Sequence, residues 1–421
     1  MTSLLEILLA IAIAFWLLLA ALGVLQNRRH SLRYRRRPPM GSATFFPSAV
    51  IIMPIKGIDH DLPSCISGLC TQDYRDYRVI IVFESQDDPA FALVQSELAK
   101  HPQRESTVMI AGFSHANEGQ KVHNQRYVLQ QILPAMKDDD VLAFADSDAI
   151  PGPHWLSHMI ARLASPLAGV TTGYRWMVPD PTKPATIWSH LASVINGAIA
   201  SMHRPGSTDQ AWGGAMAMRA STARKGDLIG TLAGVLTDDY PITKMCRDLD
   251  LLVRYVPRCL AATPVDFTLH SFWTFARRQY IITRIYVPGI FWFSLTVLTL
   301  WLAGFVAAIA LTVIGFSKHG VAWQSIAPLS AMLIVALLHQ MRAHYRIATI
   351  RAAFGQSMVD QLRVTTMIDR FLTPLWIFVH WLIVLSALSS NRFTWRGYRY
   401  QLDGPRQVKR LSDEPRPLGS G

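Results

Sequence analysis

The clearest candidate for chemistry is the acidic pair in Phe144-Ala145-Asp146-Ser147-Asp148, which comes at the end of a short apolar run. Two carboxylates spaced two residues apart at the end of a buried strand project from one edge of a sheet toward the same crevice. Such oxygen ligands hold Mg²⁺ or Mn²⁺, and the cation then neutralises the charge on a leaving nucleoside diphosphate. The structural alternative is a solvated turn in which an Asp caps the next helix. We predict metal ligation by Asp146 and Asp148.

Two other acidic groups lie elsewhere in the chain. In Glu84-Ser85-Gln86-Asp87-Asp88-Pro89, Asp88 could contact the base or ribose of a nucleotide, or could begin a helix with Pro89. Asp238 and Asp239 are adjacent in a helical region. Because a like-charged neighbour raises the pKa of a carboxylate, this pair suits a general base that deprotonates an attacking hydroxyl. A solvated helix start is the alternative.

Basic and amide side chains supply the complementary charge. Arg277 and Arg278 lie in an aromatic-rich segment, where a guanidinium could hold a leaving diphosphate or contact lipid headgroups. Lys121 and Asn124 are candidates for contact with a donor or its sugar. We predict catalytic roles for Asp239, Asp238, Arg278 and Arg277. We predict that the donor is bound by Pro54, Lys56, Glu84, Asp88, Lys121, Asn124 and Asp146.

Strands that alternate with helices must position these groups. The apolar runs 49–55, 79–83, 107–111 and 141–145 predict strands, and 89–100 and 121–133 predict helices. This alternation is typical of an α/β fold with a mostly parallel sheet that is covered on both faces. In such sheets ligands bind beyond the carboxyl ends of the strands, which is where the acidic groups lie.

Long uncharged segments indicate a membrane protein. Residues 4–25 form an apolar run long enough to span a bilayer, and basic residues follow it, so we expect an anchor whose C-terminal flank faces the cytoplasm. The segments 287–316, 323–341 and 371–389 are also apolar enough to span. Residues 272–286 interleave aromatic residues with arginines, which predicts an interfacial amphipathic helix.

The number of late spans is left open by the charge pattern. One early and three late crossings of the membrane would place the basic C-terminal residues on the side away from the cytoplasm. The positive-inside rule disfavours that placement. Either the last apolar segment is re-entrant, broken at Pro374, or residues 287–316 fold as a tight hairpin.

We divide the chain into an anchor (1–26), a basic linker (27–47), an α/β domain (48–270), an interfacial helix (271–286), transmembrane segments (287–390) and a basic cytosolic tail (391–421).

The charge and cysteine content of the chain indicate what kinds of partner and which cellular compartment to expect. Of the 421 residues 17% are charged, against about 25% in ordinary soluble domains, and the net charge is +12. Without a nucleic-acid-binding signature, this charge indicates a bilayer surface and no nucleic acid. Cys65, Cys70, Cys246 and Cys259 have no metal-binding spacing, which fits small reduced residues in a cytosolic domain.

In order along the chain, these segments resemble the ceramide glucosyltransferase family, a lipid-directed branch of the inverting GT-A glycosyltransferases. The resemblance runs from the anchor through Pro-Ile-Lys-Gly (54–57), Asp-Asp-Pro-Ala (87–90), Gly-Gln-Lys-Val-His-Asn (119–124), Asp-Ser-Asp (146–148) and Asp-Asp-Tyr (238–240). It extends to Phe-Thr-Trp-Arg-Gly-Tyr-Arg-Tyr (393–400). The family's Gln/Arg-x-x-Arg-Trp motif is altered here, with Phe275 and Gln279 in place of its first and last residues.

The resemblance implies a GT-A, Rossmann-like catalytic domain with Asp88 as nucleotide-binding acid, Asp146 as metal and donor acid, Asp239 as base and Arg278 as motif arginine. It implies UDP-glucose as donor, a divalent cation (Mg²⁺ or Mn²⁺), and ceramide as acceptor, with diacylglycerol or hopanoid lipids as alternatives. It places the catalytic domain on the cytosolic face of a bacterial inner membrane or a eukaryotic Golgi or ER membrane. The competing interpretations are a processive polysaccharide synthase and a non-catalytic membrane protein that binds nucleotide.

Overall fold

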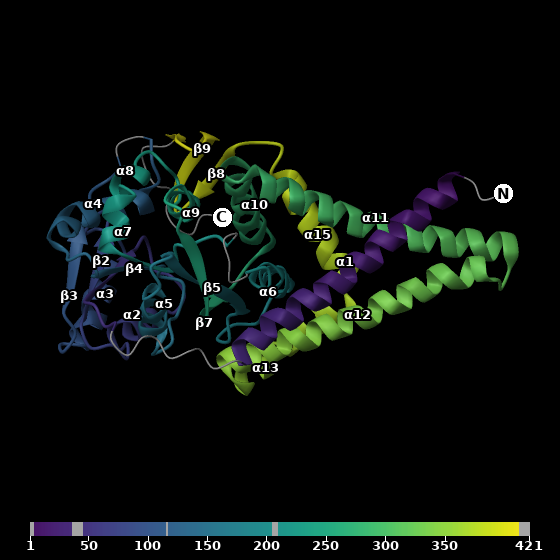
Figure 1. Ribbon diagram of the computed structural model, residues 1–421, viewed down its shortest axis with the longest axis horizontal. Helices are drawn as coiled ribbons and strands as arrows, with labels where there is room; N and C mark the ends of the chain where they lie inside the picture. Colours follow the sequence, from purple (N-terminus) through teal and green to yellow (C-terminus); the bar gives the residue numbers. More distant parts are fainter. Residues whose placement is uncertain (1–3, 36–44, 115–116, 204–208, 412–421) are drawn as a thin grey trace. The chain divides into compact units, whose positions relative to one another are not determined.

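The computed structural model describes residues 4–35, 45–114, 117–203 and 209–411. The chain divides into two units that each use separate stretches of sequence (Figure 1). The helical unit comprises Met1–Arg36, Pro181–Met202 and Phe267–Ser390, and the sheet unit comprises Arg37–Asp180, His203–Asp266 and Asn391–Gly421. The sheet unit therefore draws on the predicted C-terminal tail, and the helical unit takes one helix from within the predicted α/β domain.

A seven-stranded mixed sheet organises the sheet unit, with strand order β3-β2-β1-β4-β6-β5-β7. The first four strands in this order are parallel, β6 runs antiparallel to both β4 and β5, and β7 is parallel to β5. The predicted α/β class with a mostly parallel sheet is confirmed. The strands are β1 (Ala49–Pro54), β2 (Tyr77–Phe83), β3 (Ser106–Ile110), β4 (Val141–Ala145), β5 (Ala168–Pro179), β6 (Ala215–Arg219) and β7 (Leu252–Val265).

The central strands read as continuous apolar runs because both faces of the sheet are buried. In β1, Ile51 and Met53 belong to one apolar core and Val50 and Ile52 to the other. One face is covered by α2 (Leu62–Cys70), α3 (Phe91–Ala99) and α5 (Trp155–Leu163). The other is covered by α4 (Gln120–Ile132), α7 (Ala220–Lys225), α8 (Leu228–Thr231) and α9 (Asp239–Asp248), and a 3₁₀ turn (Leu133–Ala135) follows α4. All four cysteines are buried and free.

The described part of the segment that we predicted as a basic cytosolic tail (391–421) is folded as an antiparallel sheet. It contains β8 (Arg392–Trp395), β9 (Tyr398–Gly404) and β10 (Gln407–Arg410), in the order β10-β9-β8. Alternate side chains of β9 are buried, which is the pattern of a strand that covers a surface with one face. We call this element the C-terminal sheet.

Three helices of 32 residues each, α1 (Leu4–Arg35), α11 (Pro288–His319) and α12 (Trp323–Phe354), are long and apolar enough to cross a membrane. The count is four within the described residues if the bent pair α14 (Arg363–Phe371) and α15 (Thr373–Ser386) is one span. The remaining helices of this unit are α6 (Ile187–Ala200), α10 (Leu269–Tyr286) and α13 (Gln356–Gln361).

The two open alternatives for the late spans differ in outcome. The α11 helix is continuous, so residues 287–316 do not fold as a tight hairpin. The axes of α14 and α15 instead meet at 89°. Pro374 lies in the first turn of α15, where it lacks the N–H that would continue a preceding helix. The bend therefore lies just before Pro374, at the start of the predicted segment 371–389, and its geometry is that of a broken span or of a re-entrant loop.

Close packing and a buried ion cluster hold the long helices together. A side chain at Gly304 of α11 would overlap Trp16 of α1, so the two helices approach closely there. Asp369 of α14 accepts from Arg342 and Arg346 of α12, each at 2.8 Å, and all three side chains are buried. Buried charges require such pairing because desolvation is costly.

Candidate active site

Lys121, on the first turn of α4, is the electrostatic centre of the candidate site. Its Nζ lies 2.7 Å from Asp146 Oδ1, just beyond β4, and 3.1 Å from Asp238 Oδ2. Burial disfavours the ammonium, but the carboxylates of Asp146 and Asp238 outweigh it and raise the pKa of Lys121. One lysine therefore joins two acids that are 92 positions apart in the sequence (238 − 146).

Asp238 and Asp239 occupy different environments at the start of α9. Asp238 is fully buried and accepts from Lys121 and, at 2.7 Å, from Gln125 Nε2. Burial raises the pKa of Asp238, but Lys121 and Gln125 hold it below its usual value. Asp239 is half-buried and accepts from the Gly213 backbone N–H. Burial and then the Asp238 carboxylate raise the pKa of Asp239 to about 8. The two carboxyl groups thus differ in acidity, with the pKa of Asp238 held below and that of Asp239 raised well above the usual value.

Asp148 is paired through one of its two carboxylate oxygens. Arg175 of β5 donates to its Oδ2 at 3.3 Å, whereas its Oδ1 is buried and, within the described chain, has no hydrogen-bond partner. A buried carboxylate oxygen without a donor fits a cation. No group of three or more His, Cys, Asp or Glu side chains among the described residues could hold an ion alone. A cation on Asp146 and Asp148 would take its other ligands from phosphate and water, as Mg²⁺ commonly does.

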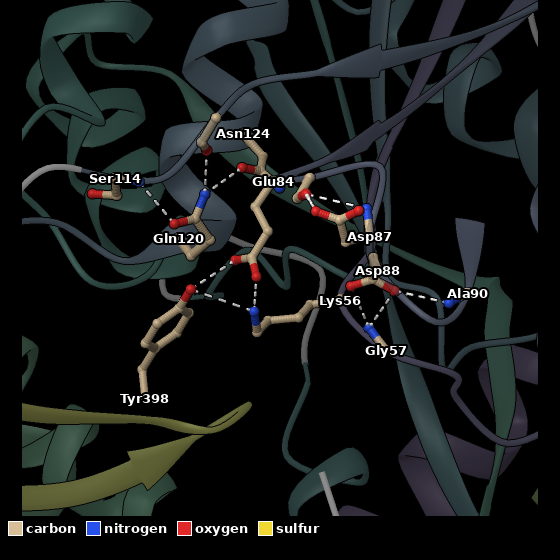
Figure 2. Close-up of polar contacts among 12 residues, drawn as sticks. Lys56, Gly57, Glu84, Asp87, Asp88, Ala90, Ser114, Gln120, Asn124 and Tyr398 are labelled. Carbon is tan, nitrogen blue, oxygen red and sulfur yellow. Dashed lines mark hydrogen bonds and ion pairs between the residues drawn. The ribbon is translucent and has the colours of Figure 1, made fainter. Parts of the chain in front are cut away.

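A second polar group lies beyond β1 and β2. Lys56 forms an ion pair with Glu84, and the Tyr398 hydroxyl donates to the other Glu84 oxygen at 3.2 Å (Figure 2). Lys56 also lies 4.4 Å from the centre of the Tyr398 ring. Burial lowers the pKa of Lys56 to about 8. The C-terminal sheet therefore contributes directly to the residues around the strand ends.

The remaining predicted donor residues make mainly structural contacts. Both oxygens of Asp88 accept from the Gly57 N–H, at 3.0 and 2.9 Å, and one also accepts from Ala90 at 2.9 Å (Figure 2). Asp88 thus ties together the loops after β1 and β2. Pro54 is the buried last residue of β1, and Asn124 accepts from Gln120 at 2.8 Å. Their contact with a donor stays a prediction.

Arg277 and Arg278 lie on α10 in the helical unit. Arg277 donates to the Ser386 and Ser390 carbonyl oxygens, each at 3.2 Å, at and beyond the end of α15. Such a contact satisfies carbonyl groups at a helix C-terminus. Arg278 lies 5.2 Å from the centre of the Phe275 ring. The catalytic roles that we predicted for both arginines stay predictions.

Several residues at the site escaped the sequence analysis. Arg396 of the β8–β9 turn pairs with Asp59 in the loop after β1, and Asp59 also accepts from the Ser147 hydroxyl. Tyr398 and Arg175 were also missed. The alternation of aromatic with basic residues in 393–400 was the available signal, since it is typical of a half-buried strand.

A mixed, mostly parallel α/β sheet that gathers acids and a lysine beyond its strand ends is the arrangement of a GT-A-like fold, and the same chain has three helices long and apolar enough to cross a membrane. The chain belongs to glycosyl transferase family 21, the ceramide glucosyltransferase family, whose sequence model matches residues 9–408. The predicted family is therefore confirmed.

Individual relatives are similar over shorter stretches. A ceramide glucosyltransferase of Komagataella phaffii is 29% identical over 112 residues, 26% of this chain and 21% of the relative. Ceramide glucosyltransferase 1 of Caenorhabditis elegans is 30% identical over 66 residues, 16% and 14% of the two chains. A solved mannosyltransferase of Pyrobaculum calidifontis, in complex with GDP-Man and Mn²⁺, aligns over 91% of this chain and 98% of its own, with 16% identity and a TM-score of 0.45.

Proposed function

We propose that this protein transfers glucose from UDP-glucose to the hydroxyl of ceramide, with inversion at the anomeric carbon, giving a glycosphingolipid. The observation that carries the proposal is the junction of Asp146, Lys121, Asp238 and Asp239, because it sets a proton acceptor beside groups suited to a charged diphosphate. The names of the relatives in the family supply the sugar and the lipid of the proposal.

In the proposed reaction, the lipid oxygen attacks the anomeric carbon as the bond from that carbon to UDP breaks. Asp239 takes the hydroxyl proton, and UDP leaves with the bonding electrons. Its raised pKa suits this step, because a base whose pKa lies near the working pH accepts a proton most effectively. Lys121 holds Asp146 and Asp238 in place, and the Gly213 N–H orients Asp239.

A divalent cation belongs to the proposal. Asp146 and Asp148 would hold it, and when bound it would neutralise negative charge on the diphosphate. Transfer that disappears with EDTA and returns with added Mn²⁺ or Mg²⁺ would support the cation.

Connectivity supports a cytosolic sheet unit. This unit contains residues both before and after the α11–α12 pair, and two crossings return the chain to the side that it left. A full extra crossing by the bent α14–α15 pair would separate the C-terminal sheet from the rest of its own unit. We therefore propose three crossings and a re-entrant α14–α15 segment. The basic residues at the end of α1 support the cytosol as the side that these segments share.

Transfer by the full-length protein in lipid nanodiscs tests the proposal. The wild-type chain should convert UDP-glucose and ceramide to monohexosylceramide, identified by mass spectrometry. Asp239→Asn should bind UDP but form no product. The matched control is Asp248→Asn at the exposed end of the same helix, which should remain active.

Each alternative outcome has its own meaning. Product only with diacylglycerol or a hopanoid would replace the acceptor, and a sugar polymer would identify a processive synthase. Hexosylceramide from Asp239→Asn at the wild-type rate would reject Asp239 as the base. Binding of UDP without any transfer would favour a non-catalytic nucleotide-binding protein.

A further inference from the structure

The turn between β8 and β9 brings an arginine to the candidate donor site. Trp395 pairs with Tyr398 across the two strands, so the turn consists of Arg396 and Gly397. Both have positive φ, 49° and 83°, as a type I′ turn requires. Asn, Asp and Gly are favoured at its first central position, and a long side chain there is strained. Turn formation alone does not account for arginine at 396.

The Arg396 side chain extends into the acidic region beyond β1 and β4. Its guanidinium forms an ion pair with Asp59, and the carboxylates of Asp148 and Asp146 also lie close enough to attract it. The side chain is one-third exposed, at 34%, so part of it remains accessible to a ligand from solvent. A polar ligand that binds among Asp59, Asp146 and Asp148 would therefore reach the guanidinium of Arg396.

The following strands bring a second cationic group close to Lys56, which also experiences the positive charge of Arg396. The ring of Tyr398 lies 4.4 Å from Lys56 Nζ and 5.0 Å from the guanidinium carbon of Arg410. Nη1 of Arg410 is buried and has no hydrogen-bond partner among the described residues. A buried guanidinium donor without an acceptor is costly, and an anionic ligand would supply the acceptor. This observation is independent of the turn and also indicates an anion.

We propose that the C-terminal sheet completes the donor site, with Arg396 binding the diphosphate of the nucleotide sugar and Arg410 adding a second positive charge beside it. The inference rests on the proposed function and assigns a donor-binding role to a sheet outside the seven-stranded core. Without donor, Arg396 pairs with Asp59. When a diphosphate is bound, its oxygens compete for the guanidinium, whose paired donors suit phosphate. Asp59 then keeps its hydrogen bond from Ser147.

Asparagine at position 396 gives a clean test, because it favours the turn while removing the guanidinium. The full-length protein in nanodiscs would be titrated with UDP and with uridine, which lacks the phosphates. Arg396→Asn should weaken UDP binding about tenfold or more and leave uridine binding unchanged. Arg396→Lys, which keeps the charge but not the paired donors, should fall between the two.

The matched control is Arg399→Gln, which removes a positive charge from the exposed face of β9 and should leave the binding of both ligands unchanged. Wild-type UDP affinity in Arg396→Asn would overturn the inference and leave the proposed function standing. Equal losses for UDP and uridine would also overturn it, since they would indicate a structural role. A wild-type protein that binds no UDP, GDP or TDP would overturn the proposed function and this inference together.

Discussion

The pKa of Asp239 leads to a quantitative prediction for the pH dependence of transfer. Burial and the Asp238 carboxylate raise this pKa to about 8, and only the ionised carboxylate can take a proton. The ionised fraction is about one half at pH 8, about one tenth at pH 7 and about one hundredth at pH 6. The transfer rate should therefore rise about tenfold per pH unit below the midpoint and level off above it.

Two neighbouring substitutions should move this midpoint in opposite directions. Asp238→Asn removes the like charge that raises the pKa of Asp239, so the midpoint should fall. Lys121→Met removes the cation that lowers it, so the midpoint should rise. A charge within a few ångströms of a carboxylate shifts its pKa by about one unit or more, which gives the expected size of each change.

The assay is the rate of hexosyl-lipid formation in nanodiscs at saturating donor and lipid, where the profile reports groups in the enzyme–substrate complex. Asp248→Asn, at the far end of α9, should reproduce the wild-type profile. A flat wild-type profile from about pH 6 to about pH 9 would refute the assignment of Asp239 as the base. Shifts of the two variants in the same direction would refute the electrostatic reasoning.

Two further predictions concern packing and buried charge. A methyl group at Gly213 would overlap the Asp238 carboxylate, so Gly213→Ala should cost about 1–3 kcal/mol of stability and most of the transfer activity, measured by thermal unfolding and product formation. Gly152→Ala, where a Cβ meets nothing within 4 Å, should change neither. Asp369→Asn leaves two buried arginines without their carboxylate and should destabilise the helical unit by about 3–5 kcal/mol. Asp360→Asn, which alters an exposed pair, should leave the melting temperature unchanged, and equal effects of the two variants would contradict the burial argument.

The sequence predicted the central strands well because β1, β2 and β4 are buried on both faces and read as apolar runs. Boundaries agreed to within about two residues for this reason. The strand end after β4 also located Asp146 and Asp148. The pairing of β6 between β4 and β5 is set by contacts distant in sequence, and local periodicity carries no information about it.

The partners of the site residues were harder to predict. The bridge from Lys121 to Asp146 and Asp238 depends on where three separate elements end. The C-terminal sheet was missed because its arginines were counted as membrane-facing charge, although Phe393, Tyr398 and Tyr400 mark a buried face. Its turn also lacks the common Asn-Gly signal, since Arg396 takes the first position.

The late position of the C-terminal sheet has a consequence during translation. Asp59 and Arg396 are 337 positions apart, so at about 5–20 residues per second the ribosome adds the second roughly 20–70 seconds after the first. In that interval α11 and α12 emerge and can insert into the bilayer. A nascent chain would therefore lack the proposed donor contacts of the C-terminal sheet until α11 and α12 have been made. Premature termination just before β8 should yield a membrane-inserted protein that cannot retain the sugar donor.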